Sequence, residues 1–317
     1  MQILVTRPRR AYLLNTTIEL IGQDATRGVD TAVADPVNNA AQIADSGRSA
    51  SAMLCPMARS RDGVEIAYET HGRTDGDAPA VVLIHGWAGN RTFWSRQVDL
   101  LAETYQVVAL DLGGHGESGV GRDDWNLPAF GDDVVAVVEE VGAGDVALVG
   151  HSMGGDAAVF AARLLGDRVR GVVWVDTFRS LGDEPTSSAE DVAQFVAPFH
   201  VDFGAAVDRF ARSLFPEEAD PALVDHVARS MVAAPREASL GSIGHALNRH
   251  PPIIAVLAEL SAPVVAMNPD VSPTDAESMR GHGVEPIILT GVGHFSMLED
   301  PDQFNPLLAA TLTSFFG

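Results

Sequence analysis

The sequence contains no lysine: all 21 of its basic residues are arginines, in a chain of 317 residues. A lysine Schiff base, a lysine-anchored pyridoxal phosphate and a phosphate-loop lysine are therefore impossible. Cysteine is almost absent as well: Cys55 is the only cysteine in the sequence. One cysteine excludes an internal disulfide, a cysteine-ligated zinc cluster and an iron–sulfur cluster. It also favours a cytoplasmic location. We expect no metal and no cofactor.

Positive charge is scarce, and the formal net charge is -22. An acidic surface repels nucleic acid and anionic lipid at long range, so we expect no nucleic-acid partner and no membrane partner. Long apolar runs are also missing, which argues against a membrane span. The hydrophobic fraction of 46% and the length suit one large α/β domain. We expect a monomer or a homodimer that acts on a small molecule.

Residues 1–56 differ from the rest of the chain, because they show no clear period and few aromatic residues. The apolar stretch at 11–22 is interrupted by polar residues, so it is a poor signal peptide. We expect a disordered N-terminal extension, with Met53 and Met57 as candidate natural start residues.

From Ser60 onward the pattern becomes regular. Asp62-Gly63 predicts a tight turn, and the alternation from Val64 to Tyr68 predicts a hairpin with one buried face. Six continuous apolar runs of strand length follow, at 80–85, 106–111, 145–150, 170–176, 262–268 and 285–290. Runs that are apolar on both faces indicate central parallel strands. Helical spacing occurs at 92–103, 127–141, 152–165 and 302–316, which predicts a parallel sheet covered on both faces.

One interval breaks this alternation. Between Asp176 and Ala262 there is no strand-like run, but helical patterns occur at 187–197, 203–214, 221–233 and 236–248. A segment of this length must have structure of its own. We therefore predict a helical cap over 178–260, inserted after the sixth strand into a core formed by 57–177 and 261–317.

The strongest chemical signal is Gly150-His151-Ser152-Met153-Gly154, directly after a predicted strand and before a predicted helix. It matches the pattern G-x-S-x-G, in which a strained turn exposes the serine hydroxyl at the carboxyl edge of the sheet. The helix N-terminus also presents unpaired N–H groups to a developing anion. We predict Ser152 as a nucleophile.

Two further loops end at the same edge of the predicted sheet. His85-Gly86-Trp87 follows the strand 80–85, and its backbone can aim an N–H at the reacting carbonyl. We predict an oxyanion hole formed by the N–H groups of Trp87 and Met153. Gly291-Val292-Gly293-His294-Phe295 follows the last strand, and this placement selects His294 as the general base among 10 histidines.

Taken together, the motifs HGW (85–87), DLGGHGES (111–118), GHSMGG (150–155) and GVGHF (291–295) resemble those of the α/β-hydrolase superfamily with a helical cap. The resemblance covers about residues 59–317. It implies a mostly parallel, eight-stranded sheet with helices on both faces and the cap after strand 6. It also implies that the turn Asp111–Ser118 is structural.

The acid of the triad is left open by the sequence. The family often places it after the strand at 262–268, where this chain has Ser272 in the usual position, although Asp270 or Asp275 could substitute. Some members take it from the end of the preceding strand, where Asp176 stands. We favour Asp176 and keep Asp270 as the alternative, because geometry and not chain order defines a triad.

A serine nucleophile argues against haloalkane dehalogenases and cap-bearing epoxide hydrolases, which use an aspartate at that turn. We predict a carboxylic ester hydrolase that works through an acyl-enzyme on short-chain or lactone substrates. Phe195, Phe199 and Phe210 of the cap are the predicted pocket residues. Three alternatives stay open: a cofactor-free perhydrolase, a carbon–carbon bond hydrolase, and a ligand receptor or signalling module that retains the triad.

Overall fold

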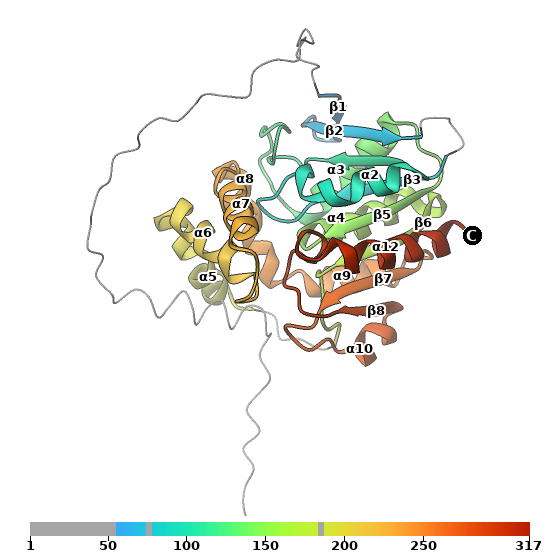
Figure 1. The fold of residues 1–317 in the computed structure, drawn as a ribbon. Coiled ribbons are helices and arrows are strands. Elements are labelled where there is room, and N and C mark those ends of the chain that lie inside the picture. The colour runs from blue at the N-terminus through green and yellow to red at the C-terminus, as the bar shows by residue number, and fades with distance from the viewer. Residues whose placement is uncertain (1–54, 74–77, 183–186) are drawn as a thin grey trace, which may run out of the picture.

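The computed structural model describes residues 55–73, 78–182 and 187–317 (Figure 1). The predicted disordered extension falls almost wholly within residues 1–54, outside the described residues. Within these described ranges, eight strands form one sheet in the order β1-β2-β4-β3-β5-β6-β7-β8. The strands are β1 Met57–Arg59, β2 Glu65–Gly72, β3 Ala80–Ile84, β4 Gln106–Leu110, β5 Val146–His151, β6 Val169–Val175, β7 Val264–Pro269 and β8 Val284–Leu289.

The direction of pairing changes once across the sheet. β1 and β2 form the antiparallel hairpin predicted around Asp62-Gly63, and β2 also pairs antiparallel with β4. From β4 onward every neighbouring pair is parallel. All parallel strands therefore end at the same edge, which is where ligands bind in open α/β sheets. The mostly parallel, eight-stranded sheet predicted from the sequence is confirmed.

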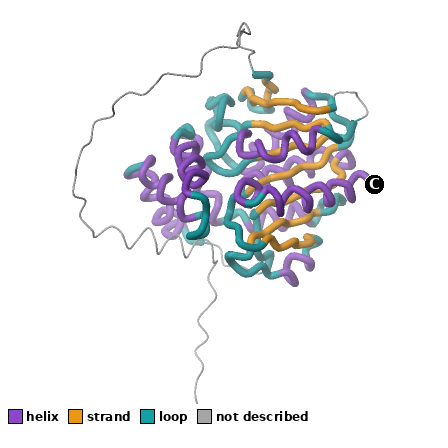
Figure 2. The backbone as a smooth tube through the Cα atoms, in the orientation of Figure 1, coloured by secondary structure: helices purple, strands orange, loops and turns teal. Residues whose placement is uncertain are grey.

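Two apolar layers cover the sheet, and Figure 2 shows helices on both sides of it. Strand β5 contributes to both, because Val146 and Leu148 pack on one face while Ala147 and Val149 pack on the other. This alternation follows from the two-residue period of a strand. The first layer is completed by α3 (Leu127–Glu140), α4 (Met153–Leu165) and α9 (His250–Leu257). The second is completed by α2 (Ser95–Ala102) and α12 (Pro301–Phe316).

The last strand departs from the sequence prediction. The apolar run at 285–290 predicted a central strand, but β8 is the edge strand beyond β7. Its middle residues are only half covered, and Ile288 is 45% exposed. A short apolar run does not by itself tell a central strand from an edge strand, since both bury at least one face. Helix α10 (Ala276–Gly281), which was not predicted, packs beside β8.

Between β6 and β7 the structure is helical, as the sequence indicated. Helices α5 to α8 are grouped to one side of the sheet (Figure 1). Their bounds are α5 Ala189–Val201, α6 Phe203–Ser213, α7 Pro221–Val232 and α8 Arg236–Ile243. Side-chain caps fix several starts: Ser188 forms a capping box for α5, and Asp202 and Asp220 cap α6 and α7. Over the described part of the chain, no helix is both long and apolar enough to cross a membrane.

Helix α9 was not predicted from the sequence. It begins His250-Pro251-Pro252, and prolines are unfavourable in a helix interior. At the first turn, however, a proline loses nothing, since its missing N–H would be unpaired there. α9 packs against α4 in the layer that covers the sheet. The division of the chain into core and cap stays a prediction.

The turn after β4 is held by its own polar groups. The buried carboxylate of Asp111 accepts hydrogen bonds from the backbone N–H of Arg91 at 2.7 Å and of Glu117 at 2.9 Å, and it pairs with the Arg91 guanidinium. Ser118 Oγ donates to the Asp111 carbonyl at 2.6 Å and accepts from Ala67 N–H at 2.8 Å. These bonds tie the turn to β2 and to the loop after β3.

A buried ion pair beside this turn gives a stability prediction. Arg122 pairs with Asp133 on α3 and with Asp62, and the Arg122 and Asp133 side chains are 3% and 0% exposed. Asp133 also accepts a hydrogen bond from Gly113 N–H at 2.9 Å. Arg122→Met should leave a buried carboxylate without its counter-charge, and should lower the free energy of unfolding by about 3–5 kcal/mol. Urea unfolding measures this loss.

The control is Arg170→Met, because Arg170 forms a similar pair with Asp145 in which both side chains are about half exposed. Solvent-exposed pairs add little to stability. The control should therefore leave the unfolding midpoint nearly unchanged. Equal losses in the two variants would contradict the importance given to burial.

Candidate active site

Ser152 stands at the sharp turn between β5 and α4. Its backbone has φ 53° and ψ -119°, a conformation that is strained for a residue with a side chain. A Cβ atom at Gly150 would lie 2.2 Å from the Gly154 carbonyl oxygen. A Cβ at Gly154 would lie 2.5 Å from the His85 carbonyl oxygen, and one at Gly155 would lie 2.1 Å from Thr177 Oγ1. The glycines of the motif are therefore required, because strand and helix nearly touch.

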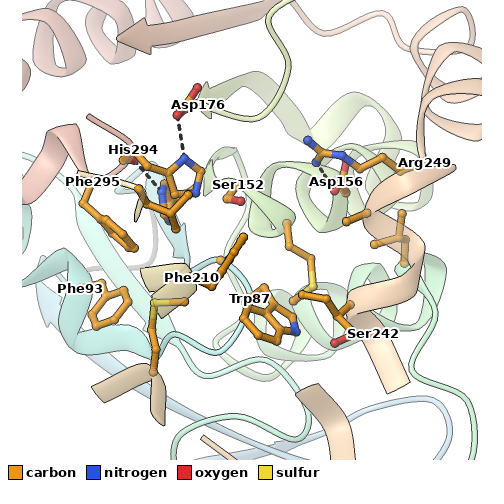
Figure 3. Close-up of a pocket in the computed structure, with 18 of the residues that line it drawn as sticks. Trp87, Phe93, Ser152, Asp156, Asp176, Phe210, Ser242, Arg249, His294 and Phe295 are labelled. Atoms are coloured by element: carbon orange, nitrogen blue, oxygen red, sulfur yellow. Dashed lines mark hydrogen bonds and ion pairs between the residues drawn. The ribbon is translucent and has the colours of Figure 1, made fainter. Parts of the chain in front are cut away.

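His294 lies in the loop between β8 and α11 (Ser296–Glu299) and faces the same turn. Figure 3 shows Ser152 beside the His294 ring on the wall of one cavity. His294 Nδ1 lies 2.7 Å from Asp176 Oδ2. With its Nδ1 proton donated to the carboxylate, the ring keeps Nε2 as its unprotonated, basic nitrogen.

The structure brings Asp176, and not Asp270, to His294. Asp176 follows β6 directly, with a positive φ of 46°, and its N–H donates to the Met267 carbonyl of β7 at 3.0 Å. Asp270 instead accepts a hydrogen bond from Gly291 N–H at 3.0 Å. Asp275 caps α10 by accepting from Ser278 N–H.

Sequence reasoning missed two residues that hold this pair. Arg179 contacts the Asp176 carboxylate at 3.0 Å and donates to the carbonyls of Pro269 and Ser272, both at 2.9 Å. It thereby ties the loop after β7 to the end of β6. The spacing of three residues between Asp176 and Arg179 is the only sequence signal for this contact.

Glu299 is the other missed residue. Its carboxylate accepts hydrogen bonds from Gly293 N–H at 2.8 Å and from Phe295 N–H at 2.9 Å, on either side of His294. The carboxylate therefore fixes the loop that carries the imidazole. Burial raises the pKa of Glu299, although these two N–H groups oppose the shift.

The two predicted oxyanion donors flank the serine. A Cβ at Gly86 would lie 3.0 Å from Ser152 Cβ, so the loop after β3 runs directly against the nucleophile turn. Among the described residues, no acceptor is paired with the backbone N–H of Trp87 or Met153. The Trp87 indole N–H donates to the Ser239 carbonyl of α8 at 2.9 Å, which fixes this loop against the helices that follow β6.

Three buried histidines surround this centre. His85 Nε2 accepts from Leu112 N–H at 3.0 Å, so its proton is on Nδ1 and is donated to the Gly86 carbonyl. The ring of His151 lies 4.5 Å from that of His294 and 2.9 Å from its carbonyl oxygen. His115 contacts both His85 and Phe130. Burial lowers the pKa of His85 to about 4, that of His115 to about 3, and that of His151 well below its ordinary value.

Ser152, His294 and Asp176 line a cavity of about 150 Å³ whose walls are mostly apolar. Of the predicted pocket residues, Phe195 and Phe210 line it and Phe199 does not. Phe199 is fully buried behind the wall, where it packs edge-on against Trp87 and Phe210. A large aromatic side chain on a short helix can pack into the protein interior as well as border a cavity, and the sequence pattern does not separate the two.

The polar part of the cavity wall includes one more charged pair, Asp156 with Arg249 (Figure 3). The sequence analysis singled out neither residue. Arg249 lies in no motif. Among the described residues, no group of three or more histidine, cysteine, aspartate or glutamate side chains is arranged to hold a metal ion.

Comparisons with known proteins agree with this fold. A family model described as the alpha/beta hydrolase fold matches residues 79–215. A bifunctional esterase/perhydrolase from Acinetobacter calcoaceticus is 38% identical over 117 residues, which is 36% of this chain and 42% of that protein. The match spans less than half the length of the first curated relatives.

Solved structures resemble the chain over a longer range. A thermophilic esterase from Thermogutta terrifontis has a TM-score of 0.68 and 23% identity, over 83% of this chain and 99% of that one. A bromoperoxidase from Bacillus anthracis has a TM-score of 0.69 and 22% identity, over 82% of this chain and 99% of that one. The family match and these structures together show that the chain has the α/β-hydrolase fold, as its motifs indicated.

The buried histidines predict a loss of stability in acid. In the folded protein His85 and His115 stay neutral, whereas in the unfolded chain they bind protons below about pH 6.5. Because the unfolded state then binds more protons, the free energy of unfolding should fall as pH drops from 6.5 toward 4. Each histidine should contribute about 1.4 kcal/mol per pH unit.

The measurement is urea unfolding across this pH range, for the natural protein and for His115→Leu. The variant should show a shallower dependence on pH, since one buried histidine is missing. An unchanged slope would contradict the assignment of His115 as a neutral buried group.

Proposed function

We propose that the protein is a serine hydrolase that cleaves carboxylic esters through an acyl-enzyme. The single observation that carries the proposal is the 2.7 Å contact between His294 Nδ1 and Asp176 Oδ2. This contact supports His294 as a general base, with its proton-accepting Nε2 facing the cavity that Ser152 lines. Ester hydrolysis needs only Ser152, His294, Asp176 and two backbone N–H donors, because water is the final acceptor of the acyl group.

The chemistry follows from these positions. Ser152 Oγ attacks the ester carbonyl while His294 Nε2 takes the hydroxyl proton, and Asp176 remains ionised and stabilises the imidazolium. The N–H groups of Trp87 and Met153 bind the oxyanion of the tetrahedral intermediate, each worth about 3 kcal/mol of transition-state stabilisation. The C–O bond then breaks, and His294 returns its proton to the leaving alcohol.

The second half of the cycle repeats the first with water as the nucleophile. His294 takes a proton from water, the hydroxide attacks the acyl-enzyme, and the free acid leaves as Ser152 recovers its proton. The cavity of about 150 Å³ and its aromatic wall at Phe195 and Phe210 favour short acyl chains or lactones.

Ester hydrolysis by variants tests the proposed acid. Asp176→Asn should lower kcat by about 10⁴, because the imidazole loses the group that fixes its tautomer. Asp270→Asn is the matched control, since Asp270 only braces the loop at Gly291, and should cost about tenfold or less. Ser152→Ala should abolish turnover. Near-full activity of Asp176→Asn would overturn the assignment.

Ester hydrolysis by variants also tests Arg179, whose Nη2 donates to Asp176 Oδ2, the carboxylate oxygen that also contacts His294 Nδ1. Arg179→Met removes this hydrogen bond together with the contacts to the loop after β7. It should lower kcat by roughly tenfold, because Asp176 is then held less firmly against the imidazole.

Arg179→Lys is the control, because it keeps a donor for Asp176 even if the contacts to the loop after β7 are lost. It should retain more activity than Arg179→Met. Equal losses of kcat in the two variants would show that Arg179 acts only through the fold.

A perhydrolase is the second candidate, because one relative is an esterase/perhydrolase and one structural neighbour is a bromoperoxidase. The same acyl-enzyme would then pass its acyl group to hydrogen peroxide and give a peracid. Peracid formation from a short-chain acid and hydrogen peroxide separates the two activities. Failure to turn over any ester, lactone or acid would favour the ligand-receptor alternative.

A further inference from the structure

The cavity has a second polar end, on the side of Ser152 away from His294 (Figure 3). Asp156 lies in the first turn of α4, four residues after Ser152. Arg249 reaches this point from the segment between α8 and α9. Both residues line the cavity.

Arg249 is held from two sides. Its Nη1 donates to Asp156 Oδ2 at 2.6 Å, and its Nη2 donates to the Thr177 carbonyl. Its guanidinium carbon lies 4.2 Å from the centre of the Phe178 ring. A guanidinium has five N–H donors in a planar fork, so these two hydrogen bonds leave donors over. The Arg249 side chain keeps 19% of its surface exposed.

The pair is polar and carries no net charge. Asp156 is 1% exposed, and among the described residues its Oδ1 has no hydrogen-bond partner. Burial raises the pKa of Asp156 to about 6, although Arg249 opposes the shift. The carboxylate is therefore ionised at neutral pH, where it balances the guanidinium.

This balance selects among the groups that could occupy the end of the cavity. A plain alkyl chain would leave the remaining donors of Arg249 without a partner, which costs free energy in an apolar site. A carboxylate would add a charge that nothing balances, because Asp156 already neutralises Arg249. An uncharged oxygen, such as a ketone or amide carbonyl, accepts from Arg249 and leaves the charge unaltered.

We propose that Arg249 and Asp156 form an acyl-chain subsite, which selects esters or lactones that carry a second, uncharged carbonyl oxygen on the side of the scissile carbonyl away from His294. The turnover test of this subsite depends on the ester hydrolysis proposed above. It assigns Arg249 the role of hydrogen-bond donor to substrate, and Asp156 the role of fixing and neutralising that donor.

Three ethyl esters of similar size test the subsite: ethyl levulinate carries a ketone, ethyl valerate is purely alkyl, and monoethyl succinate carries a carboxylate. Acid release gives kcat/KM for each. The natural protein should prefer levulinate over valerate by about tenfold or more, the worth of one hydrogen bond to a charged donor. In Arg249→Met this ratio should fall to near one.

Asp156→Asn gives a sharper outcome, because it leaves the charge of Arg249 unbalanced. The ratio of succinate to valerate should then rise about tenfold or more above that of the natural protein. Arg170→Met is the control, since it removes a surface arginine far from the cavity-lining residues, and both ratios should stay unchanged. Thermal melts show which variants fold, and Arg249→Lys, which keeps a donor, should retain part of the preference if Arg249→Met is unfolded.

A binding measurement keeps the subsite testable apart from turnover. In Ser152→Ala, calorimetry should find ethyl levulinate bound more tightly than ethyl valerate, with the difference lost when Arg249→Met is added. Equal ratios in the natural protein and in folded Arg249→Met would show that the pair only fastens the segment before α9 to α4, and would overturn the subsite. Lack of turnover in the natural protein with selective binding intact would instead overturn the proposed hydrolysis alone.

Discussion

The left-handed backbone at Ser152 is the constraint on which the rest of the site depends. Such a conformation costs of order 1–3 kcal/mol for a residue with a side chain, so the surroundings must enforce it. Three glycines make room for it, and the Ser152 N–H donates to the Val175 carbonyl of the neighbouring strand at 2.9 Å. Because β3, β5, β6 and β8 run parallel, their following loops converge on this one point. The sheet therefore keeps the Ser152 backbone in its strained conformation.

Buried charge is distributed around the cavity in balanced pairs. Asp176, which contacts His294, pairs with Arg179, and Asp156 pairs with Arg249 at the other end of the same cavity. The chain carries a formal net charge of -22, yet these pairs leave the cavity close to neutral. All the cations involved are arginines, whose forked donors can hold a carboxylate and a backbone carbonyl together. This property suits positions where one side chain must join two segments of the chain.

The sequence predicts the parts of the site that have a local signature. The strand–glycine–serine–glycine–helix pattern locates Ser152, and a glycine-flanked histidine after the last strand locates His294. The sequence favoured Asp176 as the acid but kept Asp270 open, because both aspartates follow neighbouring strands and only the three-dimensional path of the loops separates them. No sequence motif contains Arg179, Glu299 or Arg249. Their contacts join segments that are distant in sequence, or depend on the path of the backbone. The edge position of β8 and the proline-initiated helix α9 were not predicted either, because both depend on burial and on the elements that pack beside them in the folded protein.

Covalent labelling with a fluorophosphonate is the most direct test of Ser152 as the nucleophile, because this reagent phosphonylates a serine only where a base activates it and an oxyanion hole receives the P–O⁻. Intact-mass analysis followed by peptide mapping identifies the modified residue. We expect one adduct per chain, located on Ser152, with loss of ester hydrolysis in proportion to labelling and no adduct in Ser152→Ala. A folded protein that stays unlabelled at Ser152, or that hydrolyses esters while labelled there, would contradict it.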